Sequence, residues 1–205
     1  MSSRIVPAVL CAAALACAAA GSAQAHVVID PREAPAGSYF KGTFRVGHGC
    51  MGAATVAVTV SIPPSILSVR PQPKAGWQVT IEREKLAQPV AGPHGHTIDE
   101  RVARVTWRGG PLPSEFFDEF ALQLKLPGTA PDGFLNFPVR QKCETGERDW
   151  SEIPGPGQAW HELKSPAPRL RRIGPVLAQD TSHGTQRHQS GPNGSVPRVL
   201  LRAKK

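Results

Sequence analysis

The sequence predicts an all-β protein, a single domain built as an antiparallel β-sandwich of Greek-key type. Runs such as Ala54 to Ile62 and Arg101 to Trp107 alternate apolar and β-forming polar residues. A period of two is typical of strands that bury one face. Proline- and glycine-rich turns separate the runs at short, even intervals, which favours a sandwich over a parallel α/β fold. No segment has sustained helical periodicity; the best local candidate is one turn at 114–117.

The remaining expected strands follow the same rule. They cover residues 26–30, 39–46, 77–82, 119–126, 134–140 and 159–164. The turns between strands fall at 35–37, 71–76, 109–113 and 127–133, where proline or glycine is present each time. Strands and turns together fill one domain of ordinary size, from residue 26 to residue 165.

Residues 1–25 have the composition of a secretory signal peptide. Arg4 precedes an apolar stretch at 6–20, and small residues lead to a cleavage site after Ala25. A membrane anchor would need about 20 apolar residues, and no later stretch is long and apolar enough to span a bilayer. Cleavage at Cys17, as in a lipoprotein, is the alternative. We expect a soluble periplasmic or secreted protein, without a transmembrane helix in the mature chain.

Residues 166–205 are expected to form a basic, disordered tail. The segment is rich in proline, glycine, serine and arginine, and Asp180 is its single acidic residue. Such a composition buries too little apolar surface to offset the entropy of ordering the chain. The formal charge of +8 belongs to this tail and the signal segment. A neutral, exported domain is not expected to bind nucleic acid; the tail either contacts anionic surfaces or is a solvated extension.

Two cysteines, Cys50 and Cys143, remain after cleavage. An isolated pair in an oxidising compartment most simply forms one disulfide bond. The alternative is a pair of soft copper ligands. We favour the disulfide because no further cysteine or methionine cluster supports a thiolate site.

The predicted cleavage makes His26 the first residue of the mature chain, which suggests a metal site. A terminal histidine offers its α-amine and a ring nitrogen to one ion, and both groups lose a proton to a metal near neutral pH. Nitrogen donors in a plane suit Cu(II). A chance histidine at the terminus is the alternative.

Other donors are harder to assign from the residues alone. Glu33 follows a proline turn and can fold back to offer a carboxylate; a solvated loop charge is the equal alternative. Trp150 is a poor ligand that can lie beside a metal, although packing is the commoner role of a lone tryptophan. Four further histidines of the predicted domain are interpreted as surface residues: His48, His94, His96 and His161, of which His94 and His96 form a weak metal-like pair.

Motifs for catalysis are missing from the sequence. There is no nucleophile elbow, no zinc-protease helix motif, no P-loop and no dinucleotide fingerprint. We therefore do not expect an enzyme.

Several ordered blocks resemble the YcnI-like copper-binding family of exported bacterial proteins. They are AHVVIDPREAPAGS, RVGHGCMGA, IPPSI, PKAGW, PSEFFDEF and FPVRQKCETGERDW. Together they cover the predicted domain. Many relatives end in a membrane helix, which this chain replaces with its basic tail.

The resemblance implies a β-sandwich that binds Cu(II) through a single-histidine brace. His26 matches the brace, Trp150 matches the tryptophan close to the metal, and Glu33 is the less secure choice for the carboxylate. The Cys50–Cys143 pair resembles that of a cysteine-containing branch, in which a disulfide is plausible. The implied function is copper homeostasis: a periplasmic chaperone or carrier that exchanges copper with copper-trafficking proteins of the cell envelope.

Two other classes of function stay open. A copper-dependent oxidative enzyme would add a nitrogen from a second histidine, so His48 or His161 beside His26 would favour it. A cell-envelope interaction module without metal would be indifferent to an extra residue before His26.

Overall fold

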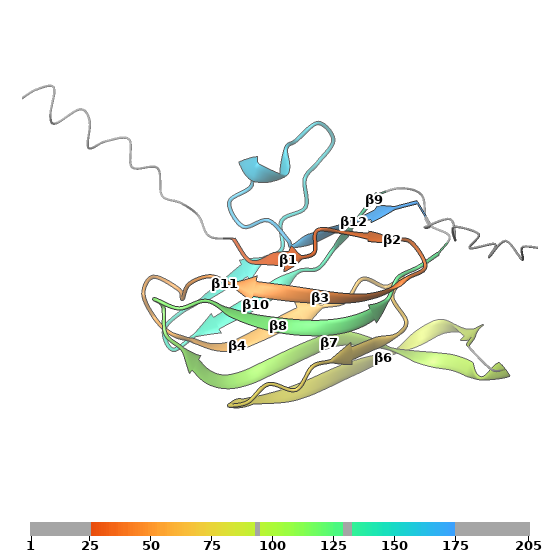
Figure 1. The fold of residues 1–205 in the computed structure, drawn as a ribbon, viewed down its shortest axis with the longest axis horizontal. Coiled ribbons are helices and arrows are strands. Elements are labelled where there is room, and N and C mark those ends of the chain that lie inside the picture. Colours follow the sequence, from red (N-terminus) through yellow and green to blue (C-terminus); the bar gives the residue numbers. More distant parts are fainter. Residues whose placement is uncertain (1–25, 93–94, 129–132, 175–205) are drawn as a thin grey trace, which may run out of the picture.

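The computed structural model describes residues 26–92, 95–128 and 133–174, which form an almost purely β domain (Figure 1). The predicted signal peptide at 1–25, the tail beyond residue 174 and His94 lie outside the described residues. No α-helix occurs within the described ranges, and the 3₁₀ turn η3 (Trp160–Glu162) interrupts the strands.

One sheet has four strands in the order β1-β3-β8-β5, all antiparallel. Its strands are β1 (Val28–Asp30), β3 (Tyr39–Val46), β8 (Asp118–Lys125) and β5 (Val69–Pro71). Burial alternates along β3, so that Phe40, Phe44 and Val46 point into the core. This is the two-residue period that the sequence predicted.

The second sheet has five antiparallel strands in the order β11-β10-β4-β7-β6. Its strands are β11 (Glu147–Trp150), β10 (Val139–Cys143), β4 (Thr55–Ser61), β7 (Thr97–Leu112) and β6 (Trp77–Ala91). The hairpin β6–β7 continues past the body of the sandwich as an arm (Figure 1). The strand expected at 77–82 is shorter than β6, because most of this edge strand is exposed and has no buried face to give an apolar pattern.

The two sheets enclose one hydrophobic core. Trp107 of β7 and Phe120 of β8 meet across the sandwich with ring centroids 5.6 Å apart, and Phe44 meets Phe137 at 5.5 Å. All four side chains are fully buried. The prediction of a β-sandwich is confirmed.

A third, small sheet corrects the predicted domain boundary. It contains β2 (Glu33–Pro35), β12 (Arg169–Ile173) and β9 (Gly133–Asn136), with β12 between the other two. The predicted tail at 166–205 therefore begins too early, because β12 belongs to the domain and buries Leu170 completely. Three of the five residues of β12 are arginines, so the segment was interpreted as part of a basic tail. Its pairing with β2 is parallel, unlike the antiparallel pairing predicted throughout.

The expected strand at 159–164 is also wrong. This segment forms η3 and is tied down by its tryptophan, whose Nε1 donates to the Ala167 carbonyl at 3.0 Å. Proline and glycine at 154–157 precede it, and such residues favour a loop over a strand.

The predicted disulfide is confirmed. Cys50 and Cys143 are bonded at 2.05 Å with their Cα atoms 5.9 Å apart. The bond joins the loop between β3 and β4 to the end of β10 in the second sheet. Cys50 and Cys143 are both buried.

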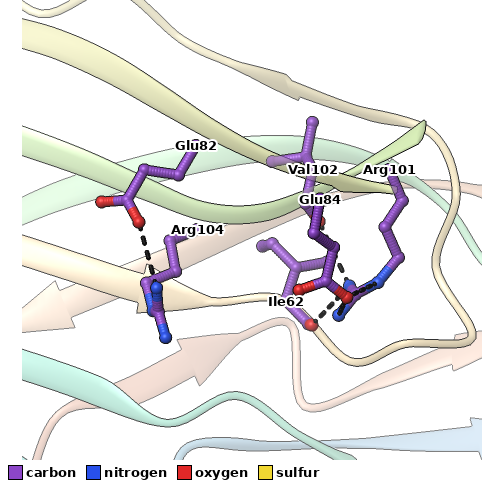
Figure 2. Close-up of polar contacts among 6 residues, drawn as sticks. All are labelled: Ile62, Glu82, Glu84, Arg101, Val102 and Arg104. Carbon is purple, nitrogen blue, oxygen red and sulfur yellow. Dashed lines mark hydrogen bonds and ion pairs between the residues drawn. The ribbon is translucent and has the colours of Figure 1, made fainter. Parts of the chain in front are cut away.

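Two arginines of β7 make contrasting contacts with β6 (Figure 2). The Arg101 guanidinium is buried; it donates to Glu84 Oε1 at 2.7 Å and to the carbonyl oxygens of Ile62 and Val102 at 3.0 and 3.2 Å. Arg104 meets Glu82 at 3.0 Å with both side chains more than half exposed. Solvent therefore screens the second contact more than the first, in which the Arg101 side chain is buried but Glu84 is half exposed.

We predict that Arg101→Met lowers the free energy of unfolding by about 1–3 kcal/mol, because buried carbonyl groups lose their donor. Arg104→Met is the matched control, with an expected loss below about 1 kcal/mol. Urea unfolding of the two variants measures both values. Equal losses would contradict the structural role given to Arg101.

Candidate functional site

His26 lies at the edge of the sandwich, just before β1. Its imidazole is half-buried between two indoles: the ring centroid is 5.8 Å from that of Trp150 and 5.3 Å from that of Trp160. The interplanar angles of 71° and 87° are those of edge-to-face packing. β1 and β11 are edge strands of the two sheets, so the cluster covers the side of the sandwich where both sheets end.

Trp150 is fixed by a buried glutamine. Its Nε1 donates to Gln141 Oε1 at 3.0 Å, and both side chains are 1% exposed. Gln141 Nε2 in turn donates to the carbonyl of His48 at 2.6 Å and to Thr55 Oγ1 at 2.8 Å. One side chain thus joins β11, β4 and the loop after β3.

The loop after β3 contains a tight turn from Cys50 to Ala53. These two residues exchange backbone hydrogen bonds of 3.1 and 3.0 Å, and φ is positive at Met51 and Gly52, as in a type I′ turn. A Cβ on Gly49 would lie 1.8 Å from the Ala53 carbonyl oxygen, so only glycine fits there. The turn and the disulfide hold the backbone beside His48.

His48 approaches the same indole as His26. Its ring centroid is 6.3 Å from that of Trp150, and its Nδ1 is 2.6 Å from the Gly49 carbonyl oxygen. The register of β1 with β3 explains the proximity. Val28 pairs with Arg45 in an antiparallel ladder, and continuing this ladder places His26 opposite Gly47, next to His48.

The pKa of His26 is lowered from its ordinary value of 6.5. Burial is the largest cause, followed by the positive charges of Arg148 and His48. The Arg148 guanidinium lies 5.3 Å from the Trp150 ring centroid, at the same cluster. The imidazole of His26 is therefore neutral at physiological pH, the form in which it binds metal ions.

Glu33 is held by another partner. Its Oε1 accepts a hydrogen bond from Arg171 Nη1 at 2.8 Å, across the parallel pairing of β2 with β12. Both residues line a cavity of about 420 Å³, which Trp160 also borders. The structure thus brings His26 and Trp150 together and engages Glu33 with Arg171; its role as a metal ligand stays a prediction.

The other histidines of the described ranges lie elsewhere. His161 is exposed on η3, and His96 is exposed at the tip of the β6–β7 arm. The predicted pairing of His96 with His94 falls on a residue outside the described part. Among described side chains, no group of three or more histidine, cysteine or acidic residues is arranged to hold a metal ion.

Three members of the cluster were not predicted from the sequence: Gln141, Arg148 and Trp160. For Gln141 a signal existed, because it occupies an inward position of β10 between buried Val139 and Cys143. A polar residue at an inward position of a strand indicates a buried hydrogen bond. Trp160 lies in a loop whose path no local pattern predicts.

These features define a class: an immunoglobulin-like β-sandwich with a disulfide between the β3–β4 loop and β10, and an aromatic–histidine cluster at one edge. The chain belongs to the family described as Domain of unknown function (DUF1775), which matches residues 26–171 and is the YcnI-like family that the sequence resembles. That match includes most of β12, in agreement with the corrected boundary.

A solved structure gives the same fold. The crystal structure of an uncharacterized protein from Nocardia farcinica, described as having an immunoglobulin-like fold, is 28% identical with a TM-score of 0.55. The match covers 72% of this chain and 98% of that one. The search of curated proteins gave no match. Within the described ranges, no helix has the length and hydrophobicity to cross a membrane.

We predict that Gln141→Leu lowers the free energy of unfolding by about 1–3 kcal/mol, since the buried Trp150 Nε1 loses its acceptor. Gln123→Leu, at an outward position of β8, is the matched control and should change stability by less than about 0.5 kcal/mol. Chemical denaturation gives both values, and the NMR resonance of the Trp150 indole N–H should shift only in Gln141→Leu. An unchanged resonance would disprove the hydrogen bond.

We also predict that His26 of the metal-free mature chain titrates below 6.5 in an NMR pH series. Arg148→Gln should move the midpoint upward, because a neighbouring positive charge that opposes protonation is removed. The exposed Lys142→Gln on β10 should leave it unchanged. Because the folded-state pKa is depressed, the stability contribution of His26 is present above 6.5 and is lost as the pH falls through the folded-state pKa. A midpoint above 6.5 would contradict the burial of His26.

Proposed function

We propose that the protein is an exported copper carrier that binds Cu(II) at His26, the first residue after removal of the signal peptide. One observation carries the proposal: the site places a neutral imidazole at the start of the domain, packed against Trp150 and Trp160. Cleavage after Ala25 would add an α-amine to the same residue. Amine and imidazole then form a chelate whose nitrogen donors suit Cu(II).

One feature of the surroundings of His26 favours a bound cation, and another opposes it. Depression of the pKa of His26 lessens competition by protons, which favours metal binding. The positive charge of Arg148 repels a copper ion bound at His26. A negatively charged carboxylate ligand would offset this repulsion. Glu33 is the carboxylate that we propose. Its exposed ion pair with Arg171 has to open first, at a cost of about 1 kcal/mol or less.

A carrier role follows from the small number of ligands. An ion held at a chain terminus remains accessible, so an acceptor protein can replace the ligands one at a time. The partners that we propose are copper-trafficking proteins of the cell envelope, in the periplasm or outside the cell. The Cys50–Cys143 disulfide is compatible with such an oxidising compartment.

A copper-dependent oxidative enzyme is the second candidate, and the position of His48 beside the Trp150 ring favours it. The two candidates differ in turnover. Copper-loaded protein given ascorbate and oxygen should produce no more hydrogen peroxide than an equal amount of the protein in which His26 is preceded by an extra alanine. If the mature chain produced much more hydrogen peroxide than the extended form, the enzyme hypothesis would replace the carrier hypothesis.

We predict that the mature chain beginning at His26 binds one Cu(II), and that one extra alanine before His26 weakens binding at least about 100-fold, or about 2.7 kcal/mol. The extra residue moves the α-amine away from the ring nitrogen and destroys the chelate. Titration against a competing chelator gives the affinities, and electron paramagnetic resonance gives the ligand type.

Equal affinity of the two forms would place the metal elsewhere, with the His94 and His96 pair next to be substituted. If neither form binds, the protein is an envelope interaction module without metal. Glu33→Gln separately tests the carboxylate: it should weaken binding in the mature chain and leave the extended form unaffected.

A further inference from the structure

We propose that His48 is a second imidazole ligand of this site, so that the metal receives three nitrogens: the amine and ring of His26 and Nε2 of His48. The inference rests on the proposed function and adds to it a ligand from the loop after β3. It adds a third nitrogen to the site, beside which the Glu33 carboxylate of the proposed function would be a further ligand.

The first reason is placement. Both imidazoles pack edge-on to the Trp150 indole, at 5.8 Å for His26 and 6.3 Å for His48. The β1–β3 ladder pairs Val28 with Arg45, and its continuation past the ends of both strands brings His26, just before β1, near His48 in the loop after β3.

The second reason is the hydrogen bond of the His48 ring. A carbonyl oxygen only accepts, so Nδ1 at 2.6 Å from the Gly49 carbonyl carries the proton. Nε2 then carries the lone pair. Histidines that bind metals show this arrangement, in which a backbone carbonyl fixes the tautomer and orients the ring.

The third reason is that the loop is rigid on both sides of His48. Its carbonyl accepts from Gln141 at 2.6 Å, the next amide (Gly49) donates to Ser114 Oγ at 3.1 Å, and Cys50 is fixed by its disulfide. A ligand on a fixed backbone loses little conformational entropy when a metal binds. Gln141 is therefore a positioning residue that holds both Trp150 and the backbone of His48.

The other side chains that could bind the metal make different contacts. The Glu33 carboxylate is engaged by Arg171, and His161 is exposed on η3. Arg148 adds positive charge near His26. A neutral imidazole adds no charge to offset it, so the three-nitrogen site relies on the strength of its copper–nitrogen bonds.

The experiment counts imidazole ligands in the mature chain loaded with one equivalent of Cu(II). Electron spin-echo modulation from the remote ring nitrogens distinguishes two coordinated imidazoles from one. His48→Asn keeps a donor for the Gly49 carbonyl and removes Nε2. We expect two imidazoles in the wild type, one in His48→Asn, and an affinity at least about tenfold lower in the variant. His161→Asn is the control and should behave as the wild type does.

The outcomes separate the two proposals. One imidazole in the wild type, together with binding that collapses when an alanine precedes His26, overturns the role of His48 and leaves the carrier intact. No binding by the wild type overturns both. Because the wild-type count does not need the variant, the inference stays testable even if His48→Asn fails to fold.

Discussion

The arrangement of the site depends on the connection between the loop after β3 and the hairpin β10–β11. Two features make it: the Cys50–Cys143 disulfide and the buried amide of Gln141, which bonds to the Trp150 indole and the His48 backbone. Both originate on β10, two positions apart, and therefore point to the same side of the strand. They add to the backbone hydrogen bond from the Glu144 amide to the Ala54 carbonyl, at 2.9 Å, where the loop enters β4. With them, Trp150 and the loop that contains His48 keep a fixed relation, and the ring of His26 packs against Trp150.

The fold class could be predicted from the sequence because several strands carry their own pattern. Alternation in β3 and β4 indicates burial, and an isolated cysteine pair suggested the disulfide. The single strand expected at 134–140 is wrong, because this segment spans β9 and the start of β10, which lie in different sheets. β12 could not be predicted in this way. Its arginines resemble a solvated tail, and it is a strand only because β2 and β9 provide hydrogen-bond partners on both sides. Pairing between distant segments is not visible in a local composition.

The candidate site was predictable to a similar extent. His26 was identified by its position after a cleavage pattern, and its neighbour Trp150 by family resemblance. The contact between them needs the two sheets to end at one edge, which no local pattern specifies. Glu33 illustrates the limit: it is close to His26 in sequence, but it belongs to β2 of the third sheet, where it pairs with Arg171 of β12. The register of β1 with β3, rather than proximity in sequence, brings His48 close to His26.

The two histidines differ in how firmly the chain holds them, and that difference bears on release of a metal. His48 sits in a loop closed by a disulfide, a tight turn and side-chain hydrogen bonds. His26 precedes the first strand, and the described contacts of its ring are packing against Trp150 and Trp160. Local opening has the lowest free energy where few interactions must break, as at chain termini. An ion shared by both would therefore leave by withdrawal of His26, with His48 keeping its place and the sandwich remaining folded.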